Sequence, residues 1–242
     1  MADSYIFDTD ISNATFYSGD DVITLNGKLA YKDGWDTRGE DRIWAGEGDD
    51  TITLNGGGDR INANGHVWDT FVEGEDGNDK IYLKGSDKTY GGVYGGKGND
   101  LIDASDAADA GILDGGEGDD EIKGNDGINK LIGGNGDDTL NAFGGNDTLE
   151  GGDGDDELYG DSGNDNLDGG DGGDYLYGGG GDDTLIGGWA EDVFIGGEGN
   201  DTFYGNSTSD FGNLDDLVKY TGSVDDYKIL KLDDAYYISD SR

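Results

Sequence analysis

The sequence predicts an all-β chain wound into a flattened coil of parallel strands, a β-solenoid. Three observations predict this fold. A nine-residue period runs from Gly115 to Tyr204 without insertion, its eighth position is always apolar, and its sixth position is Asp in nine of ten copies. Two ladders held in step over ten copies are not a chance pattern, and a fixed period of this kind is typical of repeat architectures.

Each nonapeptide divides into a loop and a strand. The first half, GGxGx, places glycine where the backbone needs left-handed or strained angles. The last three residues form a short strand with its central apolar side chain facing inward. Two nonapeptides, 18 residues, then make one turn with a strand on each face. The apolar ladder comprises Ile122, Leu131, Leu140, Leu149, Leu158, Leu167, Leu176, Leu185, Phe194 and Phe203.

The regular repeats over 115–204 are flanked by less regular sequence. Residues 36–114 keep the period with slips and are expected to continue the coil with fewer sites, and the segment 104–114 interrupts the pattern and is expected to bulge as a loop. Residues 1–35 are expected to supply lead-in strands that cover one end of the coil. Residues 205–242 are expected to form a C-terminal cap that is cut short at Arg242, because the end of a solenoid needs covering.

The composition is strongly acidic. There are 56 acidic and 15 basic residues, a formal net charge of −41, and no Lys or Arg between Lys130 and Lys219. Nucleic acid and anionic membranes are therefore poor partners, because phosphate binding requires Lys and Arg. No apolar run approaches the ~18 residues of a membrane span. A compact chain of this charge repels itself unless a basic partner, high salt or bound divalent cations neutralise it.

The sequence predicts that the chain is not an enzyme. His66 is the only histidine, and there is no cysteine. This excludes most thiol and metal-hydrolase mechanisms. The many paired carboxylates are explained by the repeat, and no GK[ST] follows the glycine runs to form a phosphate loop.

The sixth-position residues are the candidate metal ligands. One apolar residue in nine makes a thin core, so the coil is expected to need cations. Because a turn is 18 residues, the sixth positions line two edges, and carboxylate and carbonyl oxygens favour calcium over zinc, copper or magnesium. The gap that contains Asn129 lacks one carboxylate and is expected to be the weakest site. The fifth-position acids Asp119, Asp137, Asp155 and Asp182 are expected to be solvated surface charges.

The repeats GGEGDDEIK, GGNGDDTLN, GGDGDDELY, GGGGDDTLI and GGEGNDTFY closely resemble the RTX (repeats-in-toxin) calcium-binding family. This resemblance implies a right-handed parallel β-roll with Ca²⁺ ions between the loops of adjacent turns, bound by sixth-position Asp side chains and loop carbonyls. The expected side-chain ligands are Asp41, Asp50, Asp59, Asp79, Asp100, Asp120, Asp138, Asp147, Asp156, Asp165, Asp174, Asp183, Asp192 and Asp201. The expected loop glycines are Gly116, Gly118, Gly134, Gly136, Gly152, Gly154, Gly170 and Gly172.

The resemblance also implies a function. It predicts a module that is unfolded without calcium and folds on extracellular calcium, within a larger bacterial protein (toxin, adhesin or exoenzyme) that is secreted or displayed on the cell surface. The expected partners are calcium, the rest of the parent protein and a type I secretion channel. The alternative is an adhesin or carbohydrate-binding module that holds a polysaccharide through Trp35, Trp44, Trp68 or the stacked Tyr159 and Tyr177. Simple cross-strand packing explains the tyrosines equally well.

Overall fold

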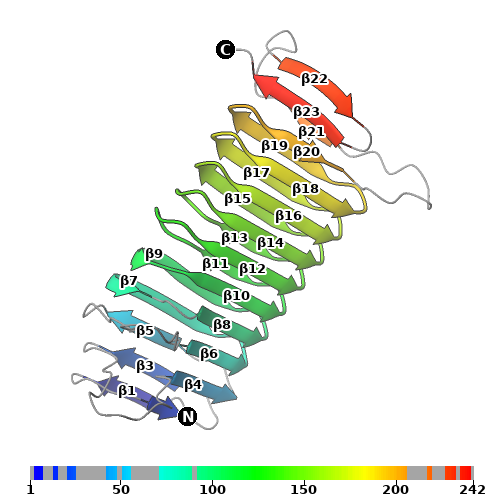
Figure 1. The fold of residues 1–242 in the computed structure, drawn as a ribbon. Helices are drawn as coiled ribbons and strands as arrows, with labels where there is room; N and C mark the ends of the chain where they lie inside the picture. Colours follow the sequence, from blue (N-terminus) through cyan, green and yellow to red (C-terminus); the bar gives the residue numbers. More distant parts are fainter. Residues whose placement is uncertain are drawn as a thin grey trace, which may run out of the picture.

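The computed structural model describes the backbone of residues 3–7, 13–15, 21–25, 42–47, 51–55, 71–88, 92–205, 217–219, 227–232 and 235–240. Side chains are described for residues 72, 74–83, 92–108 and 110–205. Every regular element in these ranges is a β-strand, and the strands alternate between two sheets as the chain winds along one axis (Figure 1).

The odd-numbered strands from β1 to β21 form the first sheet, which has 11 strands. They are β1 (Asp3–Phe7), β3 (Asp21–Leu25), β5 (Thr51–Asn55), β7 (Lys80–Lys88), β9 (Leu101–Asp109), β11 (Glu121–Lys123), β13 (Thr139–Asn141), β15 (Glu157–Ser162), β17 (Tyr175–Gly180), β19 (Val193–Glu198) and β21 (Leu217–Lys219).

The second sheet has 12 strands. They are β2 (Asn13–Thr15), β4 (Arg42–Glu47), β6 (Phe71–Asp76), β8 (Gly92–Lys97), β10 (Ile112–Glu117), β12 (Lys130–Asn135), β14 (Thr148–Asp153), β16 (Asn166–Asp171), β18 (Thr184–Trp189), β20 (Thr202–Tyr204), β23 (Ala235–Asp240) and β22 (Tyr227–Leu232). All neighbours pair in parallel except β20 with β23 and β23 with β22, which are antiparallel.

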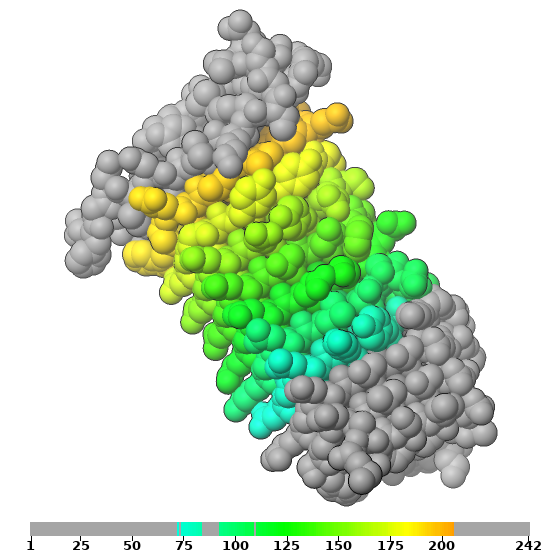
Figure 2. All heavy atoms as spheres, turned by 180° about the vertical axis from the view of Figure 1, so that it is seen from behind, coloured from blue at the N-terminus to red at the C-terminus, as the bar shows by residue number. Residues whose placement is uncertain are grey.

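The register confirms that two nonapeptides make one turn. In the second sheet, Leu131 pairs with Leu149, Leu149 with Leu167, and Leu167 with Leu185. Each step is one full turn, so identical repeat positions lie directly above one another. The described side chains form one continuous column of stacked turns (Figure 2).

The core is a single file of apolar side chains between the two sheets. The predicted ladder from Ile122 to Phe203 is buried throughout, and Val72, Ile81, Val93, Ile102 and Leu113 extend it upstream. From Ile122 to Phe203, the neighbours of each ladder residue in its strand are exposed or half-buried. This is the alternation expected when a strand faces the core on one side only. The all-β parallel solenoid is therefore confirmed.

Two details of the prediction were wrong. The strands of the regular repeats are mostly six residues long instead of three, because the glycines that follow each strand continue the pairing, as in Gly134 with Gly152. The segment 104–114 is not a loop: it completes β9 and begins β10. Its buried Ala104 and Ala110 face the core, and shifts in register against β7 absorb the additional residues.

Candidate metal sites

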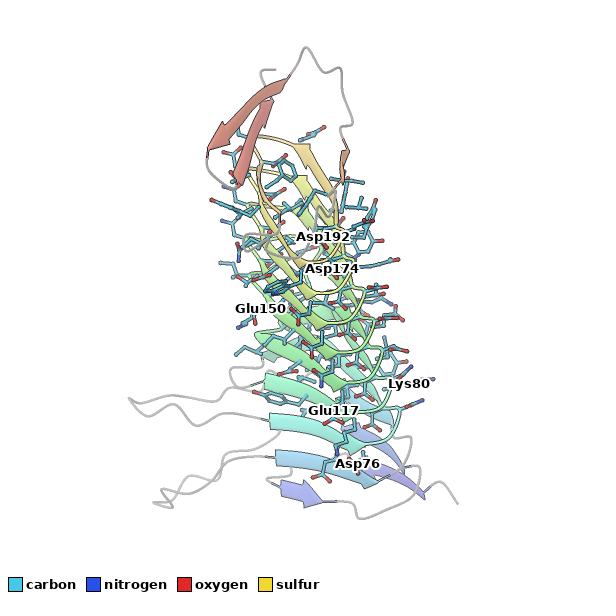
Figure 3. All side chains as sticks on the ribbon, turned by 90° about the vertical axis from the view of Figure 1, so that its right-hand side faces the viewer. Asp76, Lys80, Glu117, Glu150, Asp174 and Asp192 are labelled. Carbon is cyan, nitrogen blue, oxygen red and sulfur yellow. The ribbon has the colours of Figure 1, made fainter. Side chains whose placement is uncertain are left out.

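The sixth-position side chains lie in two columns, one on each edge where the chain passes between the sheets. We call them the first and the second column. The first column comprises Asp79, Asp100, Asp120, Asp138, Asp156, Asp174 and Asp192, and the second comprises Asn129, Asp147, Asp165, Asp183 and Asp201. All twelve are buried, the most exposed being Asp201 at 6%. Asp174 and Asp192 lie on successive turns of the first column (Figure 3).

One oxygen of each carboxylate ties adjacent turns together. The backbone N–H of Asp120 donates to Oδ1 of Asp138 at 2.7 Å, and that of Asp138 donates to Oδ1 of Asp156 at 2.8 Å. The second column repeats the pattern, with the N–H of Asp147 donating to Oδ1 of Asp165 at 2.8 Å. The same offset of 18 residues recurs along both regular columns, so each Asp is fixed by the turn before it.

The other oxygen has a different environment. Oδ2 is buried and has no hydrogen-bond partner among the described residues at Asp100, Asp120, Asp138, Asp147, Asp156, Asp165, Asp174 and Asp183. Buried polar atoms are almost always paired, and an unpaired one is a sign of a missing partner, such as an ion.

Glycine makes room for this oxygen. A Cβ added to Gly133, the first residue of its repeat, would collide with Oδ2 of Asp138 and would lie 2.7 Å from the carbonyl oxygen of Gly151 in the next turn. Gly151 stands in the same relation to Asp156 and to the carbonyl of Gly169. A carboxylate oxygen and a carbonyl oxygen from adjacent turns therefore converge beside a position that only glycine leaves open.

Burial strongly perturbs the titration of these carboxyls. Desolvation raises the pKa of Asp138, Asp156 and Asp183 to about 7 and that of Asp100 to about 8. The hydrogen bond from the backbone N–H lowers the pKa, but neighbouring carboxylates raise it again. Asp120, Asp147 and Asp174 follow the same pattern, with pKa values of about 6. Each column must therefore gain protons or cations at neutral pH.

The available ligands suit calcium. Among the described residues no three His, Cys, Asp or Glu side chains converge to hold a metal, so backbone carbonyls must supply part of any coordination shell. Hard oxygens in a flexible shell of six or more are what Ca²⁺ accepts, whereas zinc and copper prefer nitrogen and sulfur. The glycines predicted to shape these loops all have left-handed φ angles: Gly116, Gly118, Gly134, Gly136, Gly152, Gly154, Gly170 and Gly172.

The first column opens onto an acidic groove of about 760 Å³. Asn78, Asn99, Asp119 and Asp137 form its rim beside the buried Asp79, Asp100 and Asp120. This groove gives ions from solvent access to the upstream part of the column. The predicted ligands Asp41, Asp50 and Asp59 lie outside the described residues.

The fifth-position side chains accept hydrogen bonds from the next turn, a role that the sequence analysis did not predict. Oδ1 of Asp137 accepts the backbone N–H of Asp155 at 2.9 Å, and Oδ1 of Asp182 accepts that of Asn200 at 2.8 Å. Asn146 and Asn164, which lie on the second edge with Asp182, accept in the same way. These exposed side chains therefore form an outer ladder in addition to being solvated. The signal in the sequence was that most repeats have Asp or Asn at the fifth position, because either side chain places an acceptor oxygen at the same distance from the backbone.

The tyrosines are stacked as predicted. Tyr159 pairs with Tyr177 on adjacent turns, and its ring centroid lies 6.3 Å from that of Tyr177 and 6.1 Å from that of Tyr175. The rings are tilted by 46° and 55° and do not share a plane. Cross-strand packing accounts for this arrangement. Carbohydrate binding at these tyrosines stays a prediction.

Fold and site together define a class of protein: a parallel β-solenoid whose glycine loops hold stacked, buried carboxylates. The family model described as RTX calcium-binding nonapeptide repeat (4 copies) matches residues 35–65, 93–110, 114–149, 141–176, 159–193, 168–203 and 186–213. These matches span more than half of the chain. The chain therefore belongs to the RTX calcium-binding nonapeptide repeat family, as its repeats predicted, and this family binds calcium.

Two further findings complete the comparison. No curated protein matches the chain. Among the described residues there is no helix long and apolar enough to cross a membrane.

Proposed function

We propose that this chain is a calcium-controlled folding module of a larger exported bacterial protein. The observation that carries the proposal is the pair of buried carboxylate columns, in which Oδ2 of eight Asp residues between Asp100 and Asp183 is buried without a hydrogen-bond partner. Stacking such groups without a counter-charge is costly, because each carboxylate loses its hydration and repels the next. Calcium between the turns removes both costs.

The residues that would hold calcium are those of the two columns together with loop carbonyls. In the first column they are Asp79, Asp100, Asp120, Asp138, Asp156, Asp174 and Asp192, and in the second column Asp147, Asp165, Asp183 and Asp201. The loops supplying carbonyls include Gly116, Gly118, Gly134, Gly136, Gly152, Gly154, Gly170 and Gly172. When bound, the ion neutralises carboxylates and joins one turn to the next.

The same features explain a calcium switch. The core is one residue deep, the chain contains 50 glycines, and its net charge is −41. Such a chain loses much conformational entropy on folding and resists compaction. In the calcium-poor cytoplasm it would stay extended enough to pass a type I secretion channel. Extracellular modules bind calcium with dissociation constants of about 10⁻⁴–10⁻³ M, so it would fold after export.

A calcium titration followed by far-UV circular dichroism tests this proposal. Starting from calcium-free protein in excess chelator, we expect a cooperative change from coil to β-structure as free calcium reaches the sub-millimolar to millimolar range. Magnesium at the same concentrations is the control and should not produce the change, because it requires a tighter octahedral shell. A chain that is already β-rich and protease-resistant in chelator would exclude the switch.

A further inference from the structure

The turn formed by residues 124–129 departs from every other repeat loop that the structure describes. We infer that it is a metal-free link at the start of the second column, in which the side-chain amide of Asn129 makes the contacts that a cation makes elsewhere. The inference rests on the proposed function, because it names the one loop of the described columns that calcium does not fill.

Hydrogen bonds within the loop satisfy the Asn129 side chain completely. Its Nδ2 donates to the carbonyl oxygen of Gly127 at 2.8 Å and to Oδ1 of Asn125 at 3.0 Å. Its Oδ1 accepts the backbone N–H of Asn125 at 2.7 Å. The two Asn side chains are buried, at 3% and 4% exposed. In contrast to Asp147 and Asp165 of the same column, Asn129 has no buried side-chain oxygen without a hydrogen-bond partner.

Asn125 completes the arrangement. Its Oδ1 also accepts the backbone N–H of Gly127 at 2.8 Å, and its Nδ2 donates to the carbonyl of Ala107 in the preceding turn at 3.1 Å. Asn125 occupies the second position of its repeat, where the pattern GGxGxD has glycine. Both departures from the pattern, at the second and the sixth positions, therefore belong to one hydrogen-bonded unit.

The backbone shows the same difference independently. In the other repeat loops described between residues 74 and 200, the residues at the second and fourth positions have left-handed φ angles, even where they are Glu75, Phe143, Asp161 or Ala190. The segment 104–111, which carries no repeat, has a left-handed φ only at Gly111. Asn125 and Gly127 do not. The carbonyls of this loop are therefore not arranged as they are in the others, and the carbonyl of Gly127 already accepts a side-chain N–H.

The chemistry of the amide explains why no ion is needed. An amide offers two N–H donors and one acceptor, whereas a carboxylate only accepts. Asp at position 129 would face the carbonyl of Gly127 and Oδ1 of Asn125 without a donor, and would need a cation or a proton between them. The backbone N–H of Asn129 still donates to Oδ1 of Asp147 at 2.7 Å, so the ladder continues through the link.

Restoring the repeat tests the inference. The double variant Asn125→Gly with Asn129→Asp changes the loop to GGDGID, which matches the pattern of the calcium loops. Equilibrium dialysis against calcium should then give at least one more bound ion per chain than the unaltered protein. Asp165→Asn, the opposite exchange in the same column, is the matched control and should lower the number of bound ions. An unchanged number in the double variant would overturn the inference.

A second measurement does not depend on any variant folding. Anomalous scattering from crystals of the unaltered chain grown with calcium should place ions between carboxylate loops and none within the loop 124–129. An ion in that loop, with ions elsewhere, would overturn the metal-free link and leave the proposed function intact. Crystals that contain no calcium in either column would overturn both.

Discussion

The two columns use the same backbone ladder but begin differently. From Asp79 to Asp192 the first column is Asp at every turn, whereas the second column starts at Asn129. In both columns the backbone N–H of one turn donates to Oδ1 of the next, with distances of 2.7 to 3.1 Å. Stacking of the turns therefore needs only an acceptor at the sixth position.

The difference between the columns lies in the second terminal atom of the sixth-position side chain, which is Nδ2 in Asn and Oδ2 in Asp. At Asn129 it is an N–H₂ group that donates within its own loop, whereas at Asp147, Asp165 and the other Asp positions from Asp100 to Asp183 it is a buried oxygen without a hydrogen-bond partner. Under the proposed function, the dependence on metal would therefore be set turn by turn, by whether the sixth-position side chain can donate a hydrogen bond.

The largest effect that separates the two kinds of turn is the response to pH in chelator. Burial raises the pKa of Asp138, Asp156 and Asp183 from 3.8 to about 7, whereas Asn129 does not titrate. The calcium-free fold holds these protons more tightly than the unfolded chain does. Their contribution to stability is thus complete below pH 4 and is lost as the pH rises through about 7.

Calcium-stripped protein should therefore gain β-structure when the pH falls from 8 to 5, as measured by far-UV circular dichroism. With calcium present the sign reverses, because protons compete for the same oxygens and the calcium midpoint should rise as the pH falls. Asp156→Asn should weaken both responses. A β-signal in chelator that is independent of pH would contradict the burial of ionisable carboxyls in the metal-free fold.

The next effect in size comes from the loop glycines. Gly136 has a φ of +126°, and a Cβ there would collide with the carbonyl of Gly118. Gly127 lacks the left-handed φ, and a Cβ would meet only Asn125, with Oδ1 at 3.0 Å. We expect Gly136→Ala to lower the free energy of unfolding by about 2 kcal/mol or more. Gly127→Ala should cost about 1 kcal/mol or less, because only a side chain must shift.

Thermal unfolding in saturating calcium measures both variants under the same conditions. Equal losses would mean that the loop 124–129 has the same backbone conformation as the others. This outcome would remove the independent support for a metal-free link, whereas the expected difference would sharpen the contrast between the two kinds of loop.

The period of nine was enough to predict the solenoid, the inward ladder and the two columns. These features depend on which positions repeat, and the sequence states this directly. The Asn129 gap was predicted to be a weak calcium site because Asn was treated as an Asp that lacks a charge. Its partnership with Asn125 depends on the backbone angles of one loop, which the repeat pattern does not specify.

The segment 104–114 escaped prediction for a related reason. It carries no GGxGxD pattern, so it was predicted to be a loop. Ala104 and Ala110 are nevertheless buried in line with the core, and β9 simply extends to nine residues. Absence of the repeat removes the calcium loop, but it does not prevent strand pairing with the neighbouring turns.

The smallest effect on stability should come from the outer ladder of fifth-position side chains. There, two substitutions of one residue distinguish the effect of its hydrogen bond from the effect of its charge. Oδ1 of the exposed Asp137 accepts the N–H of Asp155, and its charge also raises the pKa of the buried Asp156. Asp137→Ala removes both the hydrogen bond and the charge. It should lower the free energy of unfolding in saturating calcium by about 0.5–1 kcal/mol, the typical net contribution of one hydrogen bond. Asp137→Asn keeps an acceptor, as Asn146 and Asn164 do in other turns, and should leave stability within about 0.5 kcal/mol.

Asp137→Asn should nevertheless raise the calcium midpoint slightly, because one negative charge has left the rim of the groove. Thermal unfolding and calcium titration of the two variants together resolve the roles. Equal destabilisation by Ala and Asn would mean that the charge, and not the hydrogen bond, holds the outer ladder. In that case the fifth position would act on stability through the ions, as we propose for the buried columns.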